Sequence, residues 1–295
     1  MIRAKRKHVD YLMIPDVGLC AQLACIWEAT ARKAGNVHRF ADFADVTYLD
    51  FILSAAAIAP VLATARTRPV GDTVLDCVRA TRCVVRTNTN LGIVLLLAPL
   101  AAVPEGEPLR PGVARVLASL TVEDSRQVYE AIRLAVPGGL GAASEQDVRD
   151  QPTLPLREVM ALAADRDLVA RQYALDFAEV FDDGVPHLRR ELDELGSLEA
   201  AIVRTHLYLM GRHPDTLIAR KRGSAEALEA ARRADLALAA GWPQRAEGRD
   251  AFAALDAWLR AAGHQRNPGA TADLVTACLF AALREGTPGL FNHRW

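Results

Sequence analysis

The sequence predicts an all-α fold, a single compact multi-helix bundle with a buried central helix. Alanine, leucine and arginine recur throughout the 295 residues and only 6% of the residues are aromatic, which is a helix-forming composition. No stretch shows the sustained apolar–polar alternation of a half-buried strand, so we expect no sheet. Residues 91–100 are almost wholly apolar. They are too few to cross a bilayer, which needs about 20 residues, and therefore predict the centre of the core.

Length and charge restrict the domain organisation and the partners. A chain of 295 residues can bury a full core, and we expect an N-terminal arm over 1–14 followed by one all-helical domain over 15–295. The arm is basic but lacks the continuous apolar segment of a secretory signal, which predicts a cytoplasmic location. The net charge of −1 provides no electrostatic argument for binding nucleic acid or a membrane. The oligomeric state stays open, with a homodimer among the alternatives.

The cysteines predict neither disulfides nor a zinc site. They are unevenly spaced, lie in apolar helical contexts and form no C-x-x-C pair. This pattern is typical of small core residues in a reducing compartment. The residues concerned are Cys20, Cys25, Cys77, Cys83 and Cys278.

The first two predicted helices are separated by a polar connection. Asp16 can cap a helix over 17–33, and Gly35 allows the positive φ of a C-terminal cap after it. Alanine and leucine fill a second helix over 46–65. The connection between them concentrates cations and carboxylates at one point of the chain.

A third helix leads directly into the predicted central helix. It covers 71–87 and is followed by small polar side chains at 87–90. Asn88 or Thr89 can cap the central helix, and Pro99 ends or kinks it. The backbone N–H groups at such a helix start point outward and can hold an anion.

Prolines, glycines and a capping motif divide the middle of the chain into loops and helices. Three prolines and two glycines predict that 104–112 is a loop. Thr121 and Asp124 resemble a capping box and start the next helix. The glycine-rich residues 137–141 interrupt that helix with a loop whose backbone can approach a ligand closely.

The second half of the chain predicts a long helix and several shorter ones. The long helix covers 156–181, and its polar residues repeat every seven positions, which predicts one polar stripe formed by Glu158, Asp165, Gln172 and Glu179. An i,i+4 pair between Asp167 and Arg171 would explain the charges beside the stripe. The remaining helices are predicted over 184–195, 197–211, 224–240, 249–262 and 271–285, the last of them capped by Thr271.

Five polar segments, here called polar breaks, separate the apolar helices. They contain the side chains and backbone groups that could bind a substrate. The chain contains no P-loop, Rossmann fingerprint, zinc-protease motif or nucleophile elbow. If the breaks converge, they supply amide donors and cations for phosphates and oxygen ligands for Mg²⁺. This set favours nucleotide binding. The breaks are 33–45, 87–92, 137–141, 216–223 and 267–273.

Several of these segments resemble one enzyme family. The resemblance spans nearly the whole chain and rests on Lys-Ala-Gly-Asn-Val at 33–37, Asn-Thr-Asn-Leu-Gly at 88–92, Asp-Thr-Leu-Ile-Ala-Arg at 215–220 and Asn-Pro-Gly-Ala-Thr-Ala-Asp-Leu at 267–274, with Asp45 and Tyr-Leu-Asp-Phe-Ile-Leu-Ser at 48–54. These segments resemble the triphosphoribosyl-dephospho-CoA synthase family. The resemblance implies an all-helical transferase that takes a triphosphoribosyl group from ATP, releases adenine and attaches the sugar to the ribose 2′-hydroxyl of 3′-dephospho-CoA.

The chain departs from the family pattern at positions that affect the acceptor. Ala34 stands where the family usually has proline, and Phe43 where it has histidine. Asn90 and Leu91 replace a histidine and a lysine. The chain thus resembles a divergent branch found in organisms with methanopterin-type one-carbon cofactors. A transferase that adds ribose phosphate or a nucleotide to a methanopterin- or methylofuran-type precursor is one alternative, and a non-enzymatic helical binding scaffold is another.

The resemblance and the polar breaks together assign roles to individual residues. We expect Asp42, Asp45 and Asp165 to bind Mg²⁺, with one of these carboxylates accepting the proton of the acceptor hydroxyl. Lys33, Arg220 and Lys221 are expected to hold the triphosphate of ATP. The other residues expected to bind phosphate or ribose are Asn36, Asn88, Asn90, Gly92, Asn267, Gly269 and Asp273.

Overall fold

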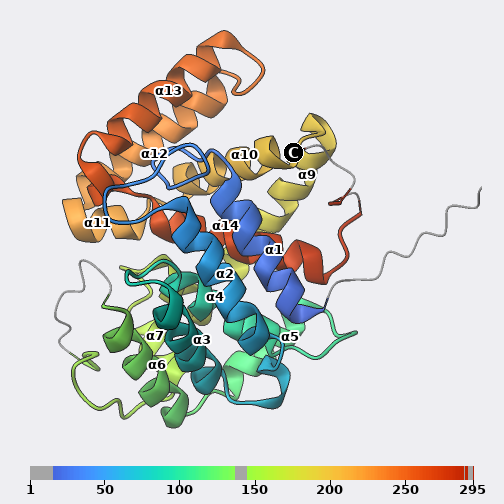
Figure 1. The fold of residues 1–295 in the computed structure, drawn as a ribbon, viewed down its shortest axis with the longest axis vertical. Helices are drawn as coiled ribbons and strands as arrows, with labels where there is room; N and C mark the ends of the chain where they lie inside the picture. Colours follow the sequence, from blue (N-terminus) through green and yellow to red (C-terminus); the bar gives the residue numbers. More distant parts are fainter. Residues whose placement is uncertain (1–15, 137–144, 289, 292–294) are drawn as a thin grey trace, which may run out of the picture.

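A computed structural model describes residues 16–136, 145–288, 290–291 and 295 (Figure 1). Within these residues the chain forms fourteen α-helices, and the only β-type pairing is an isolated bridge between His38 and Ala41. The predicted all-α class is therefore confirmed. The predicted arm over 1–14 and the glycine-rich loop over 137–141 lie outside the described residues.

The helices follow one another with short connections. The first half of the chain contains α1 (Val17–Thr30), α2 (Tyr48–Leu62), η1 (Ala65–Thr67), α3 (Val70–Val84), α4 (Leu91–Ala101), α5 (Leu109–Ala118) and α6 (Val122–Ala135). The second half contains α7 (Leu156–Ala161), α8 (Leu168–Ala174), the π-helical turn η2 (Glu179–Gly184), α9 (Val185–Leu195), α10 (Leu198–Arg212), α11 (Thr216–Arg222), α12 (Ser224–Ala239), α13 (Ala246–Arg260), η3 (Gly263–Arg266) and α14 (Gly269–Arg284).

The core is built around two helices, α4 and α14, which pack against each other. Every residue of α4 except Gly92 is buried, which confirms the predicted buried central helix. Every residue of α14 except Gly269 and Asp273 is buried as well. The sequence analysis did not single out α14 as a core helix.

Two N-terminal helix caps form where the sequence predicts them. The Asp16 carboxylate accepts a hydrogen bond from the Leu19 N–H at 3.0 Å, and Thr121 and Asp124 form the expected capping box. Gly35 has a φ of +74°. The first helix nevertheless ends at Thr30, three residues before the predicted end.

The predicted long helix over 156–181 is wrong. The chain forms α7, starts again at α8 where Asp167 caps the new helix, and then passes through Asp176 and Phe177, which both have positive φ. A carboxylate that caps a new helix start interrupts the ladder of backbone hydrogen bonds, so the seven-residue repeat does not form a single stripe.

The predicted loop over 104–112 is confirmed for 104–108 and wrong from Leu109, where α5 begins. Pro108 precedes α5 and Pro111 lies in its first turn, where a missing N–H costs no hydrogen bond. The prediction for the cysteines is wrong at one position, because Cys83 is exposed while the other four are buried. None of these five described cysteines forms a disulfide.

One helical segment of the described residues has the length and hydropathy of a membrane span. It covers Tyr48–Thr67, with a mean hydropathy of 1.7, and only 28% of this stretch is buried. Leu49 and Leu53 are among its exposed side chains.

Candidate active site

A cleft of about 990 Å³ collects the polar breaks of the chain. Figure 1 places α11 above α6 and α7 at the left of the view, and the lining residues come from both groups. Four of the five predicted breaks contribute lining residues, and the fifth lies outside the described residues. Those predicted site residues that line the cleft are Asn36, Asp45, Asn88, Asn90, Gly92, Arg220, Lys221, Asn267, Gly269 and Asp273.

Asp215 holds two of these segments together. It is fully buried, and one carboxylate oxygen caps α11 by accepting the N–H groups of Leu217 and Ile218 at 2.9 and 3.0 Å. The other oxygen accepts the N–H and hydroxyl of Thr271 at 2.7 and 2.8 Å. Thr271 is thus not the cap of α14, which begins at Gly269. The starts of α11 and α14 are tied to one carboxylate.

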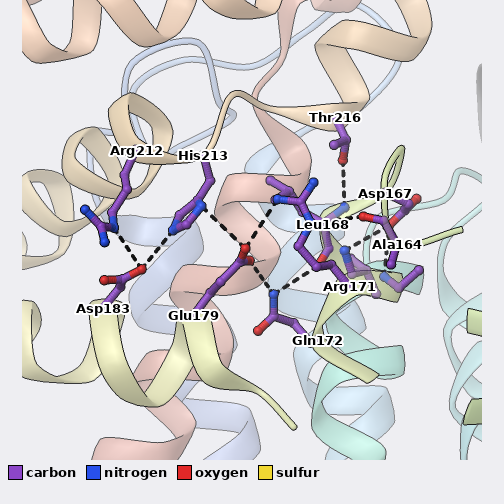
Figure 2. Close-up of polar contacts among 12 residues, drawn as sticks. Ala164, Asp167, Leu168, Arg171, Gln172, Glu179, Asp183, Arg212, His213 and Thr216 are labelled. Carbon is purple, nitrogen blue, oxygen red and sulfur yellow. Dashed lines mark hydrogen bonds and ion pairs between the residues drawn. The ribbon is translucent and has the colours of Figure 1, made fainter. Parts of the chain in front are cut away.

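The start of α8 is also hydrogen-bonded to the start of α11 (Figure 2). The Thr216 hydroxyl accepts the N–H of Leu168 at 3.0 Å. Asp167 caps α8 with one oxygen and receives the Arg220 guanidinium on the other at 2.7 Å. The predicted pair between Asp167 and Arg171 is therefore wrong.

The segment 87–92 is largely structural. Asn88 accepts the Leu91 N–H at the start of the central helix at 3.1 Å, but the residue at the N-cap position is Asn90, not Asn88 or Thr89. Asn90 is buried and donates to the Thr81 hydroxyl at 3.0 Å. Gly92 lies directly against Asp273, since a Cβ added at Gly92 would lie 2.0 Å from an Asp273 carboxyl oxygen.

A pair of asparagines joins the first break to the last. Asn36 donates from its side-chain amide to the Asn267 side-chain oxygen at 2.7 Å. The Asn36 side-chain oxygen is buried and has no hydrogen-bond partner. Both residues line the cleft.

The three predicted triphosphate-binding cations do not all line the cleft. Arg220 and Lys221 line the cleft, and burial together with the neighbouring Arg220 lowers the pKa of Lys221. Lys33 is fully buried and is not among the lining residues. Its ammonium pairs with the Glu28 carboxylate at 2.8 Å, and Glu28 lines the cleft.

The three predicted magnesium ligands are not brought together. Asp45 lines the cleft and lies 2.9 Å from the His264 ring. Asp42 accepts the Tyr48 N–H at 2.7 Å, and neither Asp42 nor Asp165 lines the cleft. The described residues contain no group of three or more histidine, cysteine, aspartate or glutamate side chains able to hold a metal.

The sequence analysis missed Glu28, and its prediction of Asp273 as a site residue stays a prediction, although Asp273 lines the cleft. Glu28 is buried although it lies on the first helix, and Arg32, one turn further along, pairs with Glu199 at 2.9 Å. A single carboxylate inside the apolar stretch Cys-Ile-Trp-Glu-Ala was the available signal. Asp273 carries a carboxyl whose pKa is raised well above its usual value by burial and by the charge of Glu28.

The comparisons with known proteins identify the family of the chain. The sequence model of the CitG family, ATP:dephospho-CoA triphosphoribosyl transferase, matches residues 15–290. The chain belongs to this transferase family. The predicted family resemblance is confirmed.

A solved structure supports the family assignment of this CitG-family chain. The structure is that of a candidate triphosphoribosyl-dephospho-CoA synthase from Archaeoglobus fulgidus. It is 26% identical, has a TM-score of 0.61 and covers 79% of this chain and 98% of that chain. No protein of curated function matches the chain.

The departures from the CitG-family pattern have structural counterparts. Leu91 is buried in α4, and Phe43 packs edge-on against the His264 ring, with 5.9 Å between ring centroids. His264 comes from η3 and pairs with Asp45 at the cleft. A histidine is thus present beside this carboxylate, although it comes from another part of the chain.

The cleft of this CitG-family member also has an extensive apolar wall. The wall comes from α6 and α7, which pack against each other. It provides a surface for an uncharged ring system, whereas the polar breaks provide cations and amides for phosphates. The apolar lining residues from these helices are Val128, Ile132, Ala135, Leu156, Val159 and Met160.

Proposed function

We propose that this protein transfers the triphosphoribosyl group of ATP to a hydroxyl of 3′-dephospho-CoA and releases adenine. The family match supports the reaction, and the single observation that carries it to this chain is the convergence of four separate polar breaks on one cleft. The proposed site draws on residues from Glu28 to Asp273, so we propose that 15–295 act as one catalytic domain. ATP and a CoA precursor are intracellular metabolites, and a cytoplasmic location is part of the proposal.

In this proposal the triphosphate is bound by Arg220, Lys221 and those first-turn amides of α4 and α14 that do not already donate to Asn88 or Asp215. Cations and helix N-termini favour phosphate charge in a partly enclosed site. The apolar wall of α6 and α7 receives the base. The reaction breaks the bond between C1′ and the base nitrogen through an oxocarbenium-like state, so the site mainly has to place the acceptor hydroxyl and stabilise charge.

The predicted magnesium site at Asp42, Asp45 and Asp165 does not fit this cleft, because only Asp45 lines it. The proposal therefore assigns no residue and no step to the ion. A requirement of the reaction for Mg²⁺ stays a prediction.

The test is to incubate the purified protein with Mg-ATP and 3′-dephospho-CoA. We expect adenine and a triphosphoribosylated dephospho-CoA in equal amounts by chromatography and mass spectrometry, and neither without acceptor. Adenine released without a CoA-type product would point to another acceptor, such as a one-carbon-cofactor precursor. Absence of both adenine and any thermal stabilisation by Mg-ATP would contradict the proposal and favour a binding scaffold.

A further inference from the structure

Four of the carboxyl groups that line the cleft differ in their partners. Glu28 pairs with Lys33 at 2.8 Å, and Asp167 pairs with Arg220 at 2.7 Å. Asp45 lies 2.9 Å from the His264 ring. The half-buried Asp273 has no hydrogen bond or ion pair with any described residue. Its carboxyl therefore stays available to a molecule in the cleft.

The packing of α14 beside α4 leaves room for this carboxyl. Gly269 and Asp273 are the only residues of α14 that are not buried, and both line the cleft one helical turn apart. The side chain reaches the first turn of α4, where Gly92 leaves room that a Cβ would fill. Any other residue at position 92 would displace the Asp273 carboxyl.

Charged groups from three other helices face Asp273. Burial raises the pKa of Asp273 well above its usual value, and the carboxylates of Glu28, Asp215 and Asp167 raise it further. The guanidinium of Arg220 opposes this effect. The helix α4 contributes no charged side chain. A carboxylate with a raised pKa is a stronger base than an exposed one.

We propose that Asp273 exchanges the proton of the transfer reaction, an inference that rests on the proposed function. As the acceptor oxygen forms its bond to C1′, its hydroxyl proton moves to the Asp273 carboxylate. The bond between C1′ and the base nitrogen breaks, and adenine leaves with the electron pair. The proton on Asp273 then completes neutral adenine, which restores the carboxylate and requires no further reactant.

The first test replaces only the titrating oxygen, in Asp273→Asn. We expect kcat to fall by about 10²- to 10⁴-fold, the contribution of a general base, while the Kd for ATP changes by less than about 3-fold. Asp250→Asn is the matched control, because Asp250 is exposed on α13 and is not among the cleft-lining residues, and it should leave kcat unchanged. Retention of more than about a third of kcat, or a parallel loss of ATP binding, would overturn the inference.

The second test needs no acceptor and separates this inference from the proposed function. A carboxyl whose folded pKa is raised loses stability relative to a neutral amide as pH rises from about 4 through that pKa. We expect the Tm of Asp273→Asn to exceed that of the wild type at pH 8 and to approach it near pH 4.5. A Tm difference that does not vary with pH would overturn the inference, whereas a wild type inactive with dephospho-CoA would reject only the proposed acceptor.

Discussion

The cleft and the polar network around Glu179 both contain acidic groups with little exposure to solvent. The two regions differ in the hydrogen-bond and ion-pair partners that these groups have. Glu179 in η2 accepts the Gln172 amide at 2.5 Å and lies 3.3 Å from Arg171 and 3.4 Å from His213 (Figure 2). His213 continues to Asp183 at 3.0 Å. In the cleft, by contrast, Asp273 lines a cavity with no partner among the described residues.

This difference separates a structural cluster from a candidate reactive group. Buried charges are normally paired and hydrogen-bonded, because an unpaired charge is costly to bury. The Glu179 carboxylate meets this requirement, and its network connects η2 to α8 and to the end of α10, which is a structural role. Stability gives no reason for an unpaired Asp273, and this favours a role in binding or catalysis.

The largest effect on stability is expected from replacing Lys33, the partner of a buried carboxylate in the cleft. Lys33→Met leaves Glu28 buried without its cation, so we expect a loss of about 3–5 kcal/mol in the free energy of unfolding, measured in urea. The double variant Glu28→Met, Lys33→Met removes both charges and should recover most of that loss. A loss below about 1 kcal/mol in Lys33→Met would show that the pair is not buried as described.

Much of the fold could be predicted because local rules decide it. Apolar runs and the caps at Asp16 and Thr121 act within a few residues and have their predicted effects. Gly35 has the predicted positive φ, but it does not cap the first helix, whose C-cap is Ala31. The break of the long helix could not be predicted in this way. Asp167 caps α8 while bound to Arg220, and that contact joins residues 53 positions apart.

The site could be predicted only as a set of segments. Polar breaks are visible in sequence, but which side chains face the cleft depends on contacts such as that of Asp215 with Thr271. Lys33 and Asp273 show the limit. Both lie in breaks, yet one turns inward to Glu28 and the other faces the cavity, and no local pattern distinguishes them.

A smaller effect is expected from neutralising the paired network. Glu179→Gln keeps the shape of the side chain but weakens its bonds to Arg171 and His213, so we expect a loss of about 2 kcal/mol in stability. The kcat of the folded protein should stay within about 2-fold. Glu194→Gln, an exposed change on α9, is the control and should stay within about 0.5 kcal/mol. A large fall in kcat in the folded Glu179→Gln protein would place this network in the reaction.

The smallest effect is expected from a change that displaces the unpaired Asp273 carboxyl but does not remove it. In Gly92→Ala the added Cβ would meet the Asp273 carboxyl at 2.0 Å, so the side chain has to move while alanine preserves the helix. We expect kcat to fall by about 10-fold, or about 1.4 kcal/mol, with little change in stability. If the alanine acts only through this carboxyl, adding it to Asp273→Asn should lower kcat no further. An additive loss in the double variant would mean that Gly92 contributes to the site through its own backbone, independently of the Asp273 carboxyl.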